Sequence, residues 1–133
     1  MWKYLIGGAV GVLVVVLGII YVSAGREHMT AAEFRDGSGY QTVALQDGVT
    51  AYKDMGPKGA VPLVIVHGAT LGSIAYEAYY APLLAQGYRV IAYDQFGRGF
   101  SDRADAPFTI DMMRTQLLGL LDHLEIEQAV LYG

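Results

Sequence analysis

The chain of 133 residues is 53% hydrophobic, has a mean hydropathy of +0.33 and carries a formal net charge of −4. This hydropathy is high for a soluble domain, and the acidic balance without a basic patch argues against nucleic-acid binding. The chain has no cysteine, which is compatible with an oxidising or a reducing compartment.

The first segment is an uncharged apolar stretch between Lys3 and Arg26 that predicts a transmembrane anchor over residues 4–24. As a helix, its 22 residues would reach roughly 33 Å, which matches a hydrocarbon core of about 30 Å. A signal peptide cleaved after Ala24 is the alternative, but the apolar stretch exceeds the roughly 7 to 15 residues of a typical signal sequence. Positive groups precede the span, whereas Glu27 offsets Arg26 after it, so we expect a cytoplasmic N-terminus and an extracytoplasmic remainder.

The next segments predict a connection and a hairpin. Residues 25–39 have mixed polarity and clustered glycines, which indicates a linker or a loosely docked lead-in. Strands are then expected at 40–45 and 49–53 around Asp47-Gly48, a dipeptide typical of tight turns between antiparallel strands.

Beyond the hairpin, strands and helices alternate, which predicts parallel strand pairing. The expected elements are a continuously apolar strand at 63–66, a helix within 75–86, a strand at 89–93, a helix at 109–123 and a strand at 129–132. Pro82 suits a first helical turn, so the regular part of the first helix is expected to begin near Tyr80 and stop at Gly87. In the second helix, Thr109 is the expected N-cap, and the expected apolar face consists of Ile110, Met113, Leu117, Leu120, Leu121 and Leu124.

Two segments at strand ends carry the residues of chemical interest. A buried strand runs into His67-Gly68, after which small residues leave backbone N–H groups free above the sheet, where a tetrahedral oxyanion could be held. Such a geometry serves acyl transfer. The next strand ends at Asp94, whose carboxylate can accept hydrogen bonds from nearby amides, while Gly97 and Gly99 permit a tight loop.

Taken together and in their order along the chain, these motifs make residues 40–133 resemble the N-terminal half of an α/β-hydrolase-fold protein. The matching motifs are the His-Gly segment, the D-x-x-G-x-G-x-S loop from Asp94 to Ser101, and a fifth strand that ends in LYG. The resemblance implies that Gly133 is the first glycine of the G-x-S-x-G nucleophile elbow, with the nucleophile two residues further on. It also implies that the acid and the catalytic histidine follow later, so the 133-residue fragment alone is expected to be inactive.

The resemblance implies roles for residues within the chain. The backbone N–H of Ala69, supported by His67 and Gly68, is expected to be one oxyanion donor, and a structural loop is expected from Asp94, Gly97, Gly99 and Ser101. Ser101 is a poor nucleophile candidate because Arg103 stands where an elbow needs its second glycine. His67 is expected to pack or hydrogen-bond near the oxyanion loop instead of acting as a base. An acyl pocket and simple helix packing both remain open for three aromatic residues: Tyr76, Tyr79 and Tyr80.

The resulting expectation is a single-pass membrane-anchored serine esterase or lipase, which acts on an apolar ester or lipid without a cofactor or metal. One alternative is a dehalogenase-like or epoxide-hydrolase-like enzyme with an Asp nucleophile at the elbow. Another is a non-catalytic membrane interaction protein for which 133 residues are the whole chain. Against that alternative, a parallel sheet that stops at its central strand would have an open edge and uncovered faces.

Overall fold

The computed structural model describes residues 2–24, 31–104 and 106–133, and the chain separates into two units, residues 1–30 and 31–133. Of the expected linker at 25–39, residues 25–30 lie outside the described residues.

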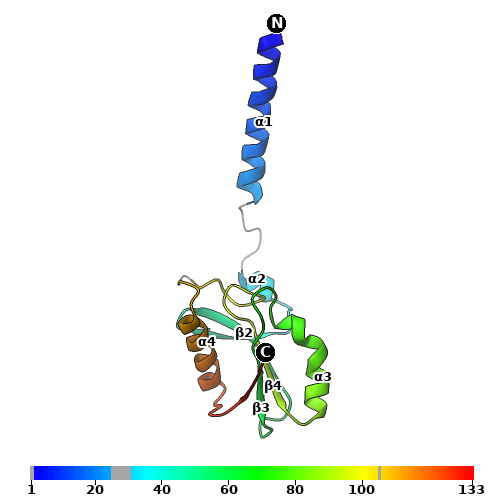
Figure 1. Cartoon of the computed structure of the whole chain (residues 1–133), viewed down its shortest axis with the longest axis vertical. Coiled ribbons are helices and arrows are strands. Elements are labelled where there is room, and N and C mark those ends of the chain that lie inside the picture. The colour runs from blue at the N-terminus through cyan, green and yellow to red at the C-terminus, as the bar shows by residue number, and fades with distance from the viewer. Residues whose placement is uncertain (1, 25–30, 105) are drawn as a thin grey trace. The chain divides into compact units, whose positions relative to one another are not determined.

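The first unit contains one helix, α1 (Trp2–Ala24), over the segment expected to form the anchor (Figure 1). The described side chains of this helix are those of residues 11–24. Among the described residues, no helix is both long and apolar enough to cross a membrane.

The second unit is built around a five-stranded sheet with the order β1-β2-β4-β3-β5 (Figure 1). Its strands are β1 (Gln41–Leu45), β2 (Gly48–Met55), β3 (Pro62–Ile65), β4 (Arg89–Tyr93) and β5 (Val130–Tyr132). β2 pairs antiparallel with β1 and β4, whereas β3 pairs parallel with β4 and β5. The expected antiparallel hairpin and parallel α/β pairing are therefore confirmed.

The hairpin turn lies one residue earlier than expected. Leu45 pairs with Gly48, so Gln46 and Asp47 form the turn and Gly48 belongs to β2. Gly48 has a φ of +145°, and a Cβ added there would lie 3.1 Å from the Cβ of Asp102. The glycine is therefore needed where the hairpin passes close to another part of the chain, and not in the turn itself.

Two helices cover opposite faces of the sheet (Figure 1). The helix α3 (Glu77–Ala85) follows a 3-10 turn, η1 (Ser73–Tyr76), and the helix α4 (Ile110–His123) precedes β5. The core on the α3 side contains Leu63, Ile65, Tyr80, Val90 and Ala92. The core on the α4 side contains Tyr52, Val64, Ile91, Tyr93, Leu120 and Ile126. Because alternate residues of β3 and β4 enter opposite cores, residues 63–65 of β3 and 90–93 of β4 form continuous runs of aliphatic and aromatic side chains.

The helix α3 begins at Glu77, so the expected start near Tyr80 is wrong. Pro82 lies inside the helix instead of in its first turn, and its side chain is exposed. The turn η1 leads the chain directly into α3, and an exposed proline leaves the carbonyl that loses its helical partner open to water. Gly87, with a φ of +87°, follows the helix as expected.

The helix α4 is capped as expected, because the Thr109 side chain accepts a hydrogen bond from the backbone N–H of Met112. Its most buried residues, however, are Met112, Gln116 and Leu120, while Ile110 of the expected apolar face is 83% exposed. The hydrogen bonds of Gln116, described below, account for this rotation of the buried stripe towards a polar residue.

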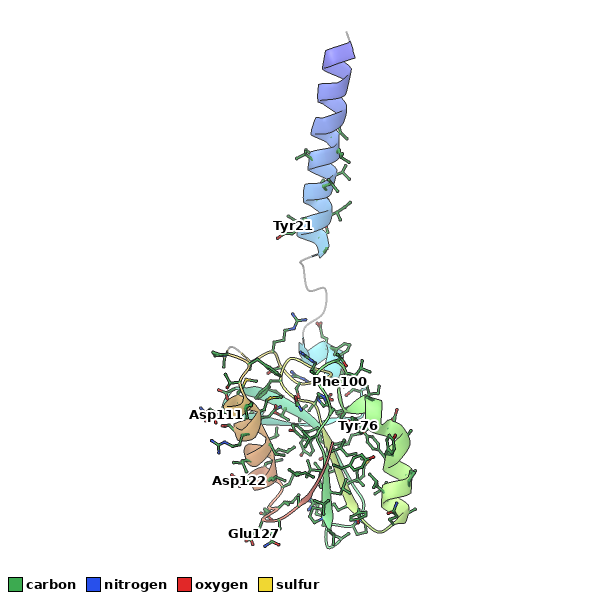
Figure 2. The ribbon with its side chains drawn as sticks, in the orientation of Figure 1. Tyr21, Tyr76, Phe100, Asp111, Asp122 and Glu127 are labelled. Atoms are coloured by element: carbon green, nitrogen blue, oxygen red, sulfur yellow. The ribbon has the colours of Figure 1, made fainter. Side chains whose placement is uncertain are left out.

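A short helix, α2 (Ala31–Arg35), occupies part of the expected linker and docks on the loop after β4. The Phe34 ring stacks on Phe100 with centroids 4.9 Å apart, and Figure 2 shows Phe100 beside this helix. Arg35 donates from Nε to the Phe100 carbonyl at 2.6 Å and forms an ion pair with Asp102. This part of the connection is therefore a docked lead-in that belongs to the second unit.

Candidate active site

Two loops leave the carboxyl ends of the parallel strands β3 and β4, the edge at which α/β proteins place their ligands. The His67 loop, residues 67–72, follows β3, and the Asp94 loop, residues 94–102, follows β4. The end of β5 lies beside the first of them, because Val66 donates its N–H to the Tyr132 carbonyl at 2.8 Å. Gly133, the expected elbow glycine, therefore lies next to the start of the His67 loop.

The His67 side chain is 3% exposed and is held on both ring nitrogens. Its Nε2 accepts from the backbone N–H of Gln95 at 2.8 Å, which leaves the ring proton on Nδ1. Nδ1 then donates to the carbonyl of Gly68 at 2.7 Å. With both nitrogens engaged by the backbone, His67 has no free nitrogen for base catalysis and serves to shape the loop.

Ala69 is exposed at the start of the loop, and its backbone N–H makes no hydrogen bond within the described part of the chain. The carbonyl before this N–H, that of Gly68, is held by His67, and the carbonyl of Ala69 itself accepts from Nε of Arg98. A peptide held in this way can present its amide to an incoming oxyanion.

The Asp94 carboxylate ties the two loops together from a position that is 1% exposed. Its Oδ1 accepts from the backbone N–H of Ser73 at 2.6 Å, and its Oδ2 accepts from that of Phe100 at 2.9 Å. A Cβ at Gly72 would lie 2.6 Å from Oδ1, and one at Gly99 would overlap the same carboxylate. Only glycine therefore allows both loops to close on Asp94.

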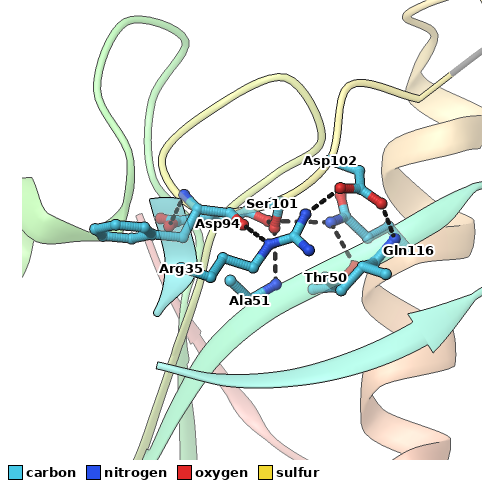
Figure 3. Close-up of polar contacts among 9 residues, drawn as sticks. Arg35, Thr50, Ala51, Asp94, Ser101, Asp102 and Gln116 are labelled. Atoms are coloured by element: carbon cyan, nitrogen blue, oxygen red, sulfur yellow. Dashed lines mark hydrogen bonds and ion pairs between the residues drawn. The ribbon is translucent and has the colours of Figure 1, made fainter. Parts of the chain in front are cut away.

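A buried hydrogen-bond network holds the backbone of the Asp94 loop against β2 and α4 (Figure 3). Ser101 donates from Oγ to the Asp94 carbonyl at 2.5 Å and accepts at the same oxygen from the Ala51 N–H at 2.9 Å. Gln116 donates to that carbonyl at 3.0 Å and to Thr50 Oγ1 at 2.9 Å. Both hydrogen-bonding functions of the Ser101 hydroxyl are thus used by the backbone.

The three tyrosines near the site have different surroundings. Tyr80 is buried and donates to the Ser73 carbonyl at 2.7 Å, and burial raises its pKa to about 12. Tyr76 and Tyr79 instead form an aromatic cluster with Tyr132, with ring centroids 6.0 to 6.2 Å apart. Two of the three candidate pocket residues therefore contact the end of β5, whereas Tyr80 packs in the core on the α3 side of the sheet.

Several residues of the site were not anticipated from the sequence: Thr50, Ser73, Gln95, Arg98 and Gln116. Gln116 carried a signal, because a polar residue stands four residues from each of two buried apolar ones, Met112 and Leu120. The others lie in loops, in β2 or at the start of η1, where nothing in a single sequence marks them. Among the described residues, no group of three or more His, Asp or Glu side chains could hold a metal ion.

Comparison with known proteins agrees with this arrangement. Residues 61–133 match the alpha/beta hydrolase fold family, so the chain belongs to that family. It is 34% identical over 93 residues to a non-heme chloroperoxidase from Streptomyces lividans, covering 69% of this chain and 34% of the relative. It is 44% identical over 75 residues to a 2-hydroxymuconate semialdehyde hydrolase from a Pseudomonas species, covering 54% and 26%.

Solved structures of the family match about two thirds of this chain. A carboxylesterase from Nitrososphaera gargenis matches with a TM-score of 0.65 and 26% identity, covering 68% of this chain and 35% of the other. The matched proteins also include a haloalkane dehalogenase and an epoxide hydrolase. The chain thus spans about a third of the length of the relatives that it matches.

Proposed function

We propose that this chain is the N-terminal part of a serine esterase that acts on an apolar ester or lipid through an acyl-enzyme. The observation that carries the proposal is the exposed Ala69 amide, which is free of any acceptor in the described chain and held between His67 and Arg98 beside the end of β5. A carboxylesterase among the structural matches supports an ester as substrate.

In this mechanism the nucleophile lies two residues after Gly133, on the turn that follows β5. Attack on the ester carbonyl places negative charge on its oxygen, which accepts from the Ala69 N–H and from the amide that follows the nucleophile. The alcohol leaves, and water then releases the acid from the acyl-enzyme. The acid and base of the triad would come from residues that follow Gly133 in the chain.

The test is covalent labelling with a fluorophosphonate, which reacts with activated serines. The complete enzyme is expected to label once, at the serine two residues after Gly133, and to hydrolyse p-nitrophenyl butyrate. The chain of residues 1–133 is expected to remain unlabelled. Labelling of this chain at Ser101, or no labelling of a complete enzyme with Ser at the elbow, contradicts the proposal.

An Asp nucleophile is the second candidate, and the relation to a haloalkane dehalogenase favours it over other variants. That relative is 44% identical over 52 residues. An Asp at the elbow would form an alkyl-enzyme or hydroxyalkyl-enzyme ester instead of an acyl-enzyme. It would not react with the fluorophosphonate, and the complete enzyme would instead release halide from a haloalkane or open an epoxide.

We also propose that residues 4–24 anchor the protein in a membrane as a single span, with residues after Arg26 outside the cytoplasm. The proposal rests on the sequence alone: the segment is uncharged and charges flank it. It goes beyond the structure, whose described residues include no helix that is both long and apolar enough to span a membrane. Mature protein is expected to keep Met1 or Trp2, and protease added to spheroplasts is expected to cut after Arg26. A mature N-terminus at Gly25 would instead establish a cleaved signal peptide.

A further inference from the structure

Arg98, in the middle of the Asp94 loop, makes an unusual set of contacts for a partly exposed arginine. Its Nε donates to the carbonyl of Ala69 in the other loop, and one terminal nitrogen donates to the carbonyl of Gly97 at 3.0 Å. The guanidinium carbon lies 5.7 Å from the centre of the Phe108 ring. No carboxylate is among these contacts, so the cation is used to hold backbone carbonyls.

These contacts complete a closed ring of hydrogen bonds between the two loops. Gln95 donates from its backbone N–H to the ring of His67 and from its side chain to the His67 carbonyl at 2.9 Å. The Arg98 N–H donates to the Gln95 carbonyl at 3.0 Å, and its side chain returns to Ala69. The Asp94 loop therefore holds the His67 loop at two points: at His67, which precedes Ala69, and at the carbonyl of Ala69 itself.

The ring fixes the peptide groups on either side of Ala69. A trans peptide is planar, with its N–H opposite its C=O, and the described chain has no cis peptide bond. His67 holds the Gly68 carbonyl and therefore directs the Ala69 N–H the opposite way. Arg98 holds the Ala69 carbonyl and so fixes the peptide between Ala69 and Thr70. Rotation of that peptide would otherwise move the backbone of Ala69.

We propose that Arg98 is a positioning residue for the Ala69 amide, which it keeps aimed at the oxyanion without touching the substrate. This inference rests on the proposed function of Ala69. A held donor needs no reorganisation when charge develops on the substrate oxygen, and a misplacement of about 1 Å can cost about 100-fold in rate. The effect of losing Arg98 should therefore fall on kcat rather than on KM.

The experiment compares Arg98→Ala, Arg98→Lys and a control, Arg114→Ala, in the complete enzyme with p-nitrophenyl butyrate. Arg114 is an exposed arginine on α4 that forms an ion pair with Asp111 at 3.6 Å. Arg98→Ala is expected to lower kcat about 10- to 100-fold, with KM within about twofold and an unchanged melting temperature. Arg98→Lys keeps one donor and should recover part of the loss, and added guanidinium should partly restore Arg98→Ala. Arg114→Ala should leave kcat unchanged.

The variant Ala69→Pro separates the two proposals. If Ala69→Pro lowers kcat by about 10² to 10³ but a folded Arg98→Ala variant retains the parent kcat, the oxyanion assignment stands and the role of Arg98 is refuted. If a folded Ala69→Pro enzyme keeps its activity, or the complete enzyme has none, the assignment of Ala69 fails and Arg98 has nothing to position.

A second measurement needs no catalysis. In the isotope-labelled complete enzyme in detergent micelles, Arg98→Ala should lower the backbone order parameters of Ala69 and Thr70 while those of β4 stay the same. Unchanged order at Ala69 in the folded variant would show that Arg98 does not hold this peptide.

Discussion

The two loops at the carboxyl edge of the sheet lie side by side, yet they are built in opposite ways. In the Asp94 loop, the carboxylate and carbonyl of Asp94 and the hydroxyl of Ser101 are buried, and each makes hydrogen bonds within the protein. In the His67 loop the residues from Gly68 to Leu71 are exposed, and Ala69 offers an unused N–H among the described contacts.

This difference teaches that one loop serves as the support of the other. Polar groups that are satisfied internally make a rigid frame, because each broken hydrogen bond would leave a buried group unpaired. A backbone amide meant for a substrate must stay unpaired until the substrate arrives, so it has to be held through its neighbours. Changes to the buried polar groups and close-packed glycines of the Asp94 loop should therefore cost stability. Changes to the Ala69 amide, or to the Arg98 side chain that holds it, should cost activity.

The largest expected effect is catalytic and comes from the His67 loop. Ala69→Pro removes the N–H donor and should lower the kcat of the complete enzyme by about 10² to 10³, or roughly 3 to 4 kcal/mol, with a near-normal KM. Ala69→Gly and Ala69→Ser keep the N–H and should stay within a few fold. Turnover of a simple ester, measured beside the melting temperature, checks this expectation. A folded proline variant with near-parent turnover would mean that the donor is another residue.

The next effect is structural and comes from the Asp94 loop. Gly99→Ala places a Cβ on the Asp94 carboxylate in a left-handed backbone with a φ of +49°, and we expect it to cost about 3 kcal/mol in the free energy of unfolding. Gly97 has a φ of +76° but no atom within 4 Å of its added Cβ, so Gly97→Ala should cost only about 1 kcal/mol. Urea unfolding followed by circular dichroism measures both. Equal losses would show that Asp94 does not fill the space at Gly99.

A smaller loss is expected at Ser101. Ser101→Ala leaves the buried Ala51 N–H without its acceptor, which should cost about 1 to 2 kcal/mol of unfolding free energy. The matched change in the exposed loop, Thr70→Ala, should stay within about 0.5 kcal/mol. The same urea titrations check this pair, and a larger loss at Thr70 than at Ser101 would reverse the assignment of frame and presenting loop.

The smallest signal is expected in the pH dependence of stability, away from both loops. At the opposite end of β4, Arg89 donates two hydrogen bonds of 2.8 Å to Asp54 and holds the pKa of that carboxyl below its usual value. A lowered pKa in the folded state stabilises the protein above the ordinary pKa of about 4, and this stabilisation is lost as the pH falls further through the folded pKa. Asp54→Asn should therefore flatten the stability profile below about pH 4. An unchanged slope would show that the pair does not contribute.

Most of the fold could be predicted from sequence because its signals are local. The apolar runs of β3 and β4 report burial on both faces, and Thr109 and Gly87 mark helix ends through groups within a few residues. The expected start of α3 is wrong because it rests on the local preference of Pro82 for a first helical turn. In the structure, η1 leads the chain into the helix five residues before Pro82. The α2 contacts with Phe100 and Asp102 span more than 60 residues and leave no local pattern.

The candidate site divides in the same way. The motif glycines and Asp94 stand out in the sequence, because a tight loop restricts which residues fit. The partners that hold them do not, since Gln95 and Arg98 act through backbone carbonyls and ring nitrogens brought together only by the parallel pairing of β3 with β4. A polar residue in the buried stripe of α4, Gln116, was the one partner with a readable signal.

The docking of α2 also constrains the order of events during synthesis. Arg35 is separated by 65 residues from Phe100, whose carbonyl it binds. A ribosome that adds about 5 to 20 residues per second needs roughly 3 to 13 s to make that stretch, whereas a short helix forms and melts in microseconds. Until then α2 has no partner and is too short to persist alone. Docking of α2 therefore has to wait until the Asp94 loop has been synthesised, and the Phe34 ring lacks its Phe100 partner during that interval.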